Sequence, residues 1–255
     1  MTTAAAIPTR SRFFVSGEEE LWSARVDALD ARDPLVASCA AIEERAWRPR
    51  EPFEQAFRRS DHLLWSSVGD ELRGFALVSF HPSRSGDLGI SIDEAMVDPA
   101  HVGEHVVSRI FWSAACGATA FASARRHRRL VFYALTSSAR LISAFYKYRF
   151  LLPDHSFAPR PWLERAAASY LERRGLASLE GGKSVWARAA FPNGLLHDEP
   201  EIPHVPLPPG FDPRVRGDAL LMVGAIPVVI ARSIAIARHA VLFRNVLGRS
   251  IVLPW

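Results

Sequence analysis

The sequence predicts an α/β domain built on a mixed sheet with one βαβ crossover in its middle. Apolar strands alternate with segments of helical periodicity along most of the chain. The segment LVFYAL, Leu130–Leu135, is short and almost wholly apolar, which is typical of a strand covered on both faces. With 255 residues, 49% of them hydrophobic, the chain is long enough to bury a core in one large domain with an appendage.

The N-terminal part begins with a predicted strand over Arg12–Val15. A helix is expected next, because four apolar residues have helical spacing: Leu21, Trp22, Val26 and Leu29. A second helix begins at Asp33. Two strands, His62–Val68 and Leu72–Phe80, flank Gly69-Asp70, and this spacing predicts a hairpin with a tight turn.

The middle of the chain continues with a strand that starts near Gly89 and a helix from about Gly103 to His127. The strand Leu130–Leu135 follows, and then a helix over Ser137–Phe150. A polar helix begins with proline at its first position, in PWLERAAASYLERRG, and ends at Gly175. KSVWARAAF is expected to be a further strand.

Composition excludes several classes of function. The two cysteines, Cys39 and Cys116, are too few for a disulfide scaffold and indicate free thiols in a reducing compartment. The N-terminus lacks the pattern of a signal peptide, so a cytoplasmic protein is expected. The net charge is +4, but no nucleic-acid-binding signature accompanies it. His101 and His105 are four residues apart without a completing carboxylate or cysteine, so no metal site is expected.

The segment IDEAMVDPAHVGEHVVSRIF, Ile92–Phe111, passes from a strand through a turn into a helix. Backbone amides at such a helix start bind anions. The segment resembles the central motif of the GNAT acyltransferase superfamily, "I-E-D-L-x-V-x-P-x-x-R-G-x-G-I-G-x-x-L". SSARLISAFYKYRF, Ser137–Phe150, is similar to the second signature of that family, "N-x-x-A-x-x-x-Y-x-x-x-G-F", chiefly in spacing. The helix and strand order from Arg12 to Phe191 resembles the family fold, a mostly antiparallel sheet with helices on both faces.

The resemblance implies a thioester donor, acetyl-coenzyme A or a longer acyl-coenzyme A, and an amine acceptor. It also implies that the central strand splays from its neighbour and that its backbone, at Ala95, Met96 and Val97, pairs with the pantetheine arm. The donor's phosphates would lie at the loop and helix start made of seven residues: Val102, Gly103, Glu104, His105, Val106, Val107 and Ser108. Ser138 and Phe145 occupy the asparagine and tyrosine positions of the second signature.

The sequence departs from the family pattern at the phosphate loop. Val102 stands where the family has arginine, and His105 and Val107 stand where it has glycine. Glycine permits a close approach of backbone to a ligand, so the two larger residues are expected to narrow or reshape the loop. An acyl carrier protein, which presents a single phosphate, is therefore an alternative donor.

Two adjacent carboxylates lie on the central strand, and we expect Asp93 and Glu94 to point to opposite faces. Either could accept the proton of an incoming amine, directly or through water. Tyr146 is the candidate acid for the leaving thiolate, because a phenol and a thiol have similar pKa values; the alternative is a partly buried aromatic.

The last quarter lies outside the resemblance. We expect three parts: a GNAT-like domain over residues 1–190, a proline-rich strap over 191–215, and an apolar extension over 216–255. The extension is too often interrupted by arginine to span a membrane, and from Pro227 it has the pattern of an amphipathic basic helix. Four roles stay open: contact with a membrane surface, cover for a lipid-binding groove, homodimer formation, or docking on the sheet.

The sequence as a whole predicts a cytoplasmic N-acyltransferase with an acyl-coenzyme A or acyl-carrier-protein donor, without metal or nucleic acid. The acyl chain is expected to be of medium or long length, with the extension as its roof. The alternative is a GNAT-like module that has lost catalysis and binds a ligand or partner, for example at a membrane surface. The acceptor amine is not specified by the sequence.

Overall fold

The structure is a computed structural model. It describes residues 11–16, 19–46, 52–82, 86–138, 151–152, 161–176, 186–187, 190, 210–212 and 217–235. The predicted helix over Ser137–Phe150 lies almost wholly outside these residues; Ser137 and Ser138, which are described, are not helical. The described part contains no helix that is both long and apolar enough to span a membrane.

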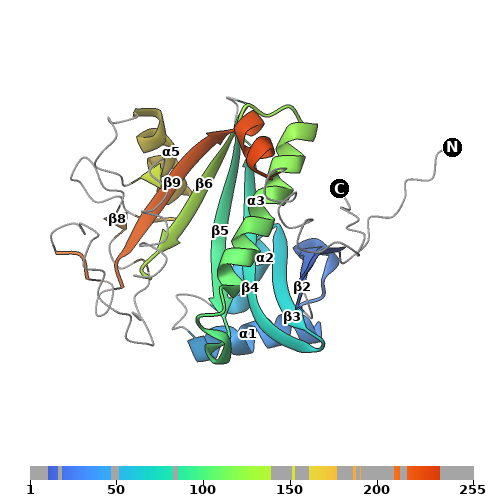
Figure 1. The fold of residues 1–255 in the computed structure, drawn as a ribbon. Coiled ribbons are helices and arrows are strands. Elements are labelled where there is room, and N and C mark those ends of the chain that lie inside the picture. The colour runs from blue at the N-terminus through green and yellow to red at the C-terminus, as the bar shows by residue number, and fades with distance from the viewer. Residues whose placement is uncertain are drawn as a thin grey trace.

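One mixed sheet organises the described residues (Figure 1). Its order is β1-β2-β3-β4-β5-β6-β9-β7, and β8 also pairs with β9. The first five strands are antiparallel neighbours: β1 (Ser11–Ser16), β2 (Glu19–Arg25), β3 (His62–Val68), β4 (Glu71–Pro82) and β5 (Leu88–Val97). The others are β6 (Arg129–Thr136), β7 (Leu151–Leu152), β8 (Trp186–Ala187) and β9 (Ala219–Pro227). Among the strand pairs of the described residues, only β5 and β6 are parallel, as the predicted crossover requires.

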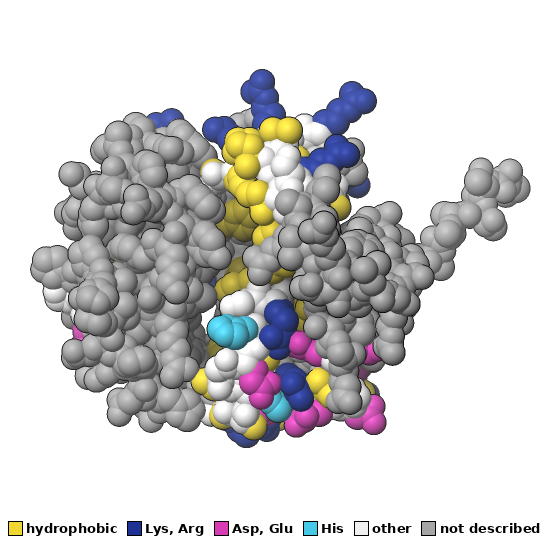
Figure 2. Space-filling model, in the orientation of Figure 1, with side chains coloured by type: hydrophobic (Ala, Val, Ile, Leu, Met, Phe, Trp, Pro, Cys, Tyr) yellow, Lys and Arg dark blue, Asp and Glu magenta, His cyan; other side chains and the backbone are white. Residues whose placement is uncertain are grey.

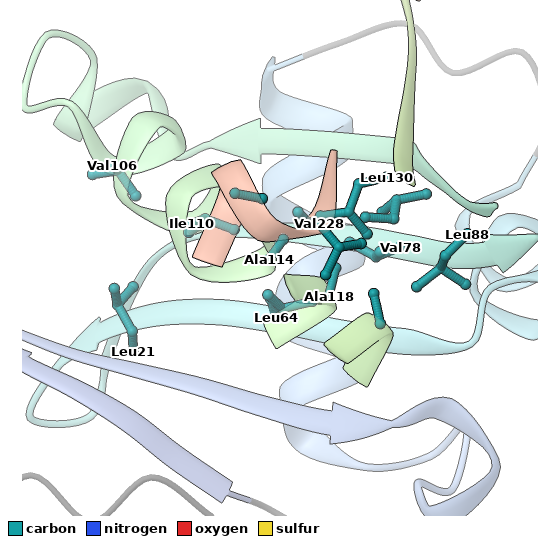
Figure 3. Close-up of a cluster of buried hydrophobic side chains, with 14 residues drawn as sticks. Leu21, Leu64, Val78, Leu88, Val106, Ile110, Ala114, Ala118, Leu130 and Val228 are labelled. Carbon is teal, nitrogen blue, oxygen red and sulfur yellow. The ribbon is translucent and has the colours of Figure 1, made fainter. Parts of the chain in front are cut away.

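Helices cover both faces of the sheet. The helix α3 (Val106–Ala124) packs on one face, where the buried cluster of Figure 3 includes Val106, Ile110 and Ala114 against strand residues such as Val78 and Ile90. The opposite face is covered by α1 (Pro34–Ala46) and α2 (Phe53–Arg59) beneath β2 to β4, and by α5 (Pro161–Arg173) beneath β6 and β9. Two short 3₁₀ helices, η1 (Val26–Ala28) and η2 (Pro99–His101), complete the described elements. The predicted fold class is confirmed.

The helix expected around Leu21, Trp22 and Val26 is a wrong prediction, because residues 19–25 form β2. Leu21 and Ala24 are buried on opposite faces of the sheet, which a strand permits and the helical spacing of the sequence concealed. Trp22 pairs with Trp65 of β3, and the two indole rings stack with centroids 6.1 Å apart. Packing on neighbouring strands overrides the local pattern here.

The extension expected from residue 216 is not separate from the sheet. Its apolar run forms β9, which pairs with the whole length of β6, from Arg129↔Pro227 to Thr136↔Leu220. Residues 228–235 are helical, as expected directly after Pro227, and begin where the amide of Val228 donates to the carbonyl of Arg128. Val228 and Ala231 pack into the cluster beneath α3 (Figure 3), whereas Ile230 and Ile234 are 49% and 44% exposed.

Candidate active site

The central strand leaves its parallel neighbour halfway along its length. The pairing of β5 with β6 runs from Leu88↔Leu130 to Ile92↔Ala134 and stops there, although β5 continues to Val97. Figure 1 shows the two strands diverging toward the end of the sheet at which α3 begins. The splay that the resemblance implied is therefore present. Among the described residues, the edge of β5 beyond Ile92 that faces β6 has backbone groups outside the ladder, and an extended ligand could pair with such groups.

A β-bulge lies at the point of divergence. Leu77 of β4 pairs with Glu94, and the next residue, Val78, pairs with Ile92, so Asp93 is the extra residue on β5. The bulge reverses the alternation of side chains: Ile92 and Ala95 both lie on the α3 face. Asp93 and Glu94 consequently lie on the same face, beside α1, α2 and α5. The expectation that the two carboxylates point to opposite faces is wrong, because it assumed a regular strand.

The carboxylate of Asp93 is surrounded by donors, and its side chain is 3% exposed. Its Oδ1 accepts from Ser91 Oγ at 2.9 Å and from Arg174 Nη1 at 3.2 Å. Its Oδ2 accepts from Ser79 Oγ and lies 3.1 Å from Ser60 Oγ, which shares its proton with the carbonyl of Ala56 at 2.9 Å. Two carboxylate oxygens have about four acceptor positions, so this set fills them. Asp93 is thus a fixed, ion-paired group, whereas Glu94 is only half-buried on the strand beside it.

A buried polar chain continues from Asp93 toward α5. His81 Nε2 lies 2.8 Å from Ser91 Oγ, and because that hydroxyl gives its proton to Asp93, His81 is the donor in this contact. The His81 ring meets the stacked pair Tyr133 and Tyr170, whose centroids are 4.8 Å apart. Burial lowers the pKa of His81 and raises the pKa of Tyr170 to about 12. Burial thus favours the neutral form of both groups.

The loop before α3 has the backbone of an anion site. Gly103 and His105 both have positive φ, 100° and 61°. The first helical bond runs from the amide of Arg109 to the carbonyl of His105 at 3.1 Å, and a helix leaves the amides ahead of that bond without intrahelical acceptors. Those amides belong to Val106, Val107 and Ser108. They carry the partial positive charge of the helix dipole, which favours an anion.

Charged side chains of both signs surround this loop. Glu104 Oε2 lies 3.1 Å from Arg73 Nη1. Arg109 Nη1 donates to the carbonyl of Glu104 at 2.6 Å, and its Nη2 lies 2.8 Å from Glu19 Oε1. Figure 2 shows acidic, basic and histidine side chains gathered at this end of α3. Two arginines therefore lie near the loop that lacks one at position 102, and each is paired with a carboxylate.

A contact from α1 also anchors the loop. Asp98, which caps η2, accepts from the amide of Ala100 at 3.0 Å and from Arg45 Nη2 at 2.5 Å. These hydrogen bonds, that of Ala100 foremost, lower the pKa of Asp98 below its ordinary value. The turn between β5 and α3 is thereby tied to the helix that covers the face with Glu94.

The structure places the predicted site residues in two groups. Ala95, Met96 and Val97 form the part of β5 beyond the β6 pairing, and the seven residues of Val102–Ser108 form the turn and the start of α3. Ser138 lies just after β6, with its amide donating to Thr136 Oγ1 at 3.0 Å. Phe145 and Tyr146 lie outside the described residues. Among the described residues, no cluster of His, Cys, Asp or Glu has the arrangement of a metal site.

Sequence reasoning did not identify the groups that hold Asp93. Arg174 is 81 residues away along the chain, and Ser60 and Ser79 are isolated serines in unrelated segments. No local pattern connects these positions, because they meet only when α2 and α5 pack on the same face of the sheet. The pairing of Glu19 with Arg109 was missed for a related reason, since residues 19–25 were assigned to a helix.

Similar solved structures are acetyltransferases. A GNAT family acetyltransferase from Elizabethkingia anophelis with acetyl-CoA bound has a TM-score of 0.43 and 11% identity, covering 83% of this chain and 100% of that chain. The IAA acetyltransferase from Bacillus cereus has a TM-score of 0.41 and 13% identity, covering 82% and 99%. An N-acetyltransferase from Staphylococcus aureus has a TM-score of 0.38 and 14% identity, covering 82% and 98%. No protein-family model and no curated protein matches the sequence.

Proposed function

We propose that this protein is an N-acyltransferase that moves an acyl group from a coenzyme A thioester to an amine. One observation carries the proposal: the carboxylate of Glu94, the edge of β5 that no described strand pairs with, and the amide-rich start of α3 lie in succession along residues 93–108. An extended thioester arm, a proton acceptor and a phosphate site are the three things that such a transfer needs. They occur here in the order in which the donor would lie.

In this proposal the donor's arm pairs with the backbone of Ala95, Met96 and Val97, and its phosphates lie at the amides of Val106, Val107 and Ser108. The amine nitrogen attacks the thioester carbonyl carbon, and a backbone N–H of β5 stabilises the oxyanion that forms. Glu94 accepts the proton that the nitrogen loses. The carbon–sulfur bond then breaks, and the products are an amide and a free thiol. Tyr146 is the proposed donor of the proton to the thiolate.

Glu94 is preferred over Asp93 as the base because of their surroundings. A carboxylate with four donors, one of them a guanidinium, is stabilised as the anion and has no free acceptor position for a substrate proton. Glu94 is the next residue, on the same face, and half-buried. In this proposal the two adjacent carboxylates, which the bulge places on one face, have different roles.

The donor that we propose has a medium or long acyl chain. Side chains at this loop add little binding free energy for the nucleotide phosphates, because Glu104 adds negative charge and Arg109 is paired with Glu19. Each buried methylene adds about 0.8 kcal/mol, so eight of them supply roughly 6 kcal/mol, more than two charge-assisted hydrogen bonds at about 3 kcal/mol. An acyl carrier protein is a second source of the same thioester arm. Rates with acetyl, octanoyl and palmitoyl thioesters, free and carrier-bound, measure these preferences.

The alternative function is a GNAT-like module without catalysis that binds a ligand or partner, in the cytoplasm or at a membrane surface. The pairing of Arg109 with Glu19 favours it, because the arginine that would compensate for Val102 is engaged. A homodimer through the C-terminal helix belongs to this alternative. The two functions differ in one measurable respect, which is turnover of a thioester in the presence of amines.

The experiment starts with coenzyme A and acetyl-coenzyme A titrated calorimetrically into the wild-type protein. Ser108 is exposed at the third residue of α3, so Ser108→Glu places a negative charge at the proposed phosphates while remaining favourable for the helix. We expect this variant to weaken binding at least about tenfold, as the loss of one charge-assisted contact predicts, and Ser108→Gln to bind like wild type. Equal binding by both variants would move the phosphates elsewhere.

Turnover is tested with Glu94→Gln, which keeps the size of the side chain and removes the proton acceptor. We expect a rate lower by about 10²–10⁴-fold with donor affinity unchanged, and partial recovery at higher pH. A variant as fast as wild type would remove Glu94 from the mechanism. A wild-type protein that binds the thioester but acylates no amine in a broad panel would support the binding module.

A further inference from the structure

Asp93 is both the first residue of β5 beyond the pairing with β6 and the residue that makes the bulge. Ile92 is the last residue of β5 paired with β6, and Asp93 follows it without a partner in the register with β4. Both irregularities, the splay and the bulge, are therefore centred on one carboxylate. That carboxylate is buried, and a buried charge is stable only where hydrogen bonds and an opposite charge compensate it.

The compensating groups come from four different elements. Ser91 belongs to β5 itself and Ser79 to β4, Ser60 ends α2, and Arg174 follows the last turn of α5. Arg174 is the only charged donor among them, at 3.2 Å from Oδ1. Since α5 packs on β6 and β9, this ion pair joins the part of the sheet on one side of the splay to the part on the other.

The bulge decides which way the proposed site points. In a regular strand, Glu94 would lie on the same face as Ile92, two residues earlier, and would enter the apolar layer beneath α3. Ala95 and Val97 would then lie on the opposite face. With the bulge, Glu94 shares the face of its cross-strand partner Leu77, and Ala95 and Val97 pack beneath α3. One inserted residue thus sets the direction of the four side chains that follow it, Glu94 to Val97.

We propose that Asp93 and Arg174 are positioning residues whose ion pair locks the bulge and holds open the edge of β5. They act through the backbone of residues 93–97 and touch neither the donor nor the acceptor. The inference rests on the proposed function only for the role of that edge in donor binding. The effect of the ion pair on the local stability of residues 93–97 is a property of the free protein.

The test is amide hydrogen exchange of the free protein, followed by mass spectrometry of peptides that cover residues 93–97. Arg174→Met removes the charge and keeps most of the stem, and we expect exchange there to rise at least about tenfold, the change that about 1.4 kcal/mol of local stability produces. Exchange in α1 is expected to stay at the wild-type level. Arg174→Lys is expected to restore most of the protection, because a cation again faces Asp93.

Arg173→Met is the matched control, since it removes the neighbouring exposed arginine of α5 without touching Asp93. Unchanged exchange at residues 93–97 in Arg174→Met, or a rise of equal size throughout the sheet, would overturn the proposal. If Arg174→Met does not fold, Ser79→Ala removes a neutral donor from the same carboxylate and must give the same localised rise, or the proposal fails.

Coenzyme A titration of the same variants separates this inference from the proposed function. A wild-type protein that does not bind coenzyme A contradicts the donor assignment. The exchange measurement still tests whether the ion pair of Asp93 and Arg174 stabilises residues 93–97. If the wild type binds, Arg174→Met is expected to bind at least about tenfold more weakly and Arg174→Lys nearly as well, because the edge that pairs with the donor is no longer fixed. Unaltered affinity in Arg174→Met would contradict the link between lock and donor site.

Discussion

His105 has the backbone conformation of a glycine with the side chain of a histidine. Its φ of 61° lies in the left-handed region, where a residue with a Cβ atom loses about 1–2 kcal/mol relative to the ordinary helical region. The resemblance predicted glycine at this position, and the positive φ gives the physical reason. The loop combines a glycine-type turn with a strained backbone and an exposed imidazole beside the helix start.

His105→Gly is therefore expected to stabilise the fold and strengthen the anion site. Relief of the left-handed strain outweighs the extra entropy of glycine in the unfolded chain, leaving a gain of about 0.5–1 kcal/mol in the free energy of unfolding. Urea denaturation measures the stability, and coenzyme A titration measures the site. His105→Ala keeps the Cβ atom and serves as the control. Equal stability of the glycine and alanine variants would show that φ at this position is not strained.

At the scale of single residues, local sequence predicted those parts of the site that are contiguous. The order Glu94, Val97, Gly103 and Val106 follows the chain, so a pattern of about 20 residues was enough to place strand, turn and helix. The bulge was not predictable, because nothing in the letters ISIDEAMV marks an extra residue. It depends on donors from α2, β4 and α5, which the sequence does not bring together.

β4 passes close beneath the start of α3. A Cβ atom on Gly74 would lie 2.7 Å from the carbonyl oxygen of Met96 and 3.0 Å from Cγ1 of Val106. Glycine here lets β4 approach both the strand and the helix of the proposed donor site. The predicted elements β3, β4, β5 and β6 are correct because their apolar patterns and turn residues agree. The error at residues 19–25 arose where an amphipathic strand also fitted a helical period.

Gly74→Ala is expected to displace β5 and α3 relative to each other. Overpacking of this kind lowers the free energy of unfolding by about 1–3 kcal/mol. Because both displaced elements belong to the proposed donor site, coenzyme A affinity of the folded variant should fall as well, as measured by calorimetry below the unfolding transition. Gly89→Ala is the matched control: its Cβ would lie 3.0 Å from His81 Cβ and from Tyr133 Cε2, on the opposite face. The control should lose similar stability and keep its affinity, and equal losses of affinity would contradict the local explanation.

For the whole molecule, the C-terminal quarter is a part of the sheet rather than an addition to it. The run ALLMVGAIP is uniformly apolar, and a run of that kind is compatible with a buried strand or a buried helix. Its place was not predictable from the preceding prolines, which suggested a linker before a separate extension. In the structure β9 lies between β6 and β7 and returns the chain to the end of the sheet opposite the proposed donor site.

The position of β9 sets where the chain can be shortened. Leu220, Leu221, Met222 and Val223 are each at most 2% exposed, and burial of a side chain of this size adds about 1.5–3 kcal/mol. Their sum, roughly 6–12 kcal/mol, equals the whole stability of an ordinary domain, about 5–15 kcal/mol. Removal of residues 214–255 would also leave β6 without its antiparallel partner along all eight residues.

We therefore expect the chain without residues 214–255 to have no cooperative thermal transition by circular dichroism and to aggregate through the exposed edge of β6. The chain without residues 236–255 keeps β9 and the described helical residues 228–235, and we expect it to melt cooperatively. The shorter deletion is consequently the correct one for asking whether the C-terminal segment selects long acyl donors. A cooperative transition in the longer deletion would show that β9 is dispensable and that the extension is separate after all.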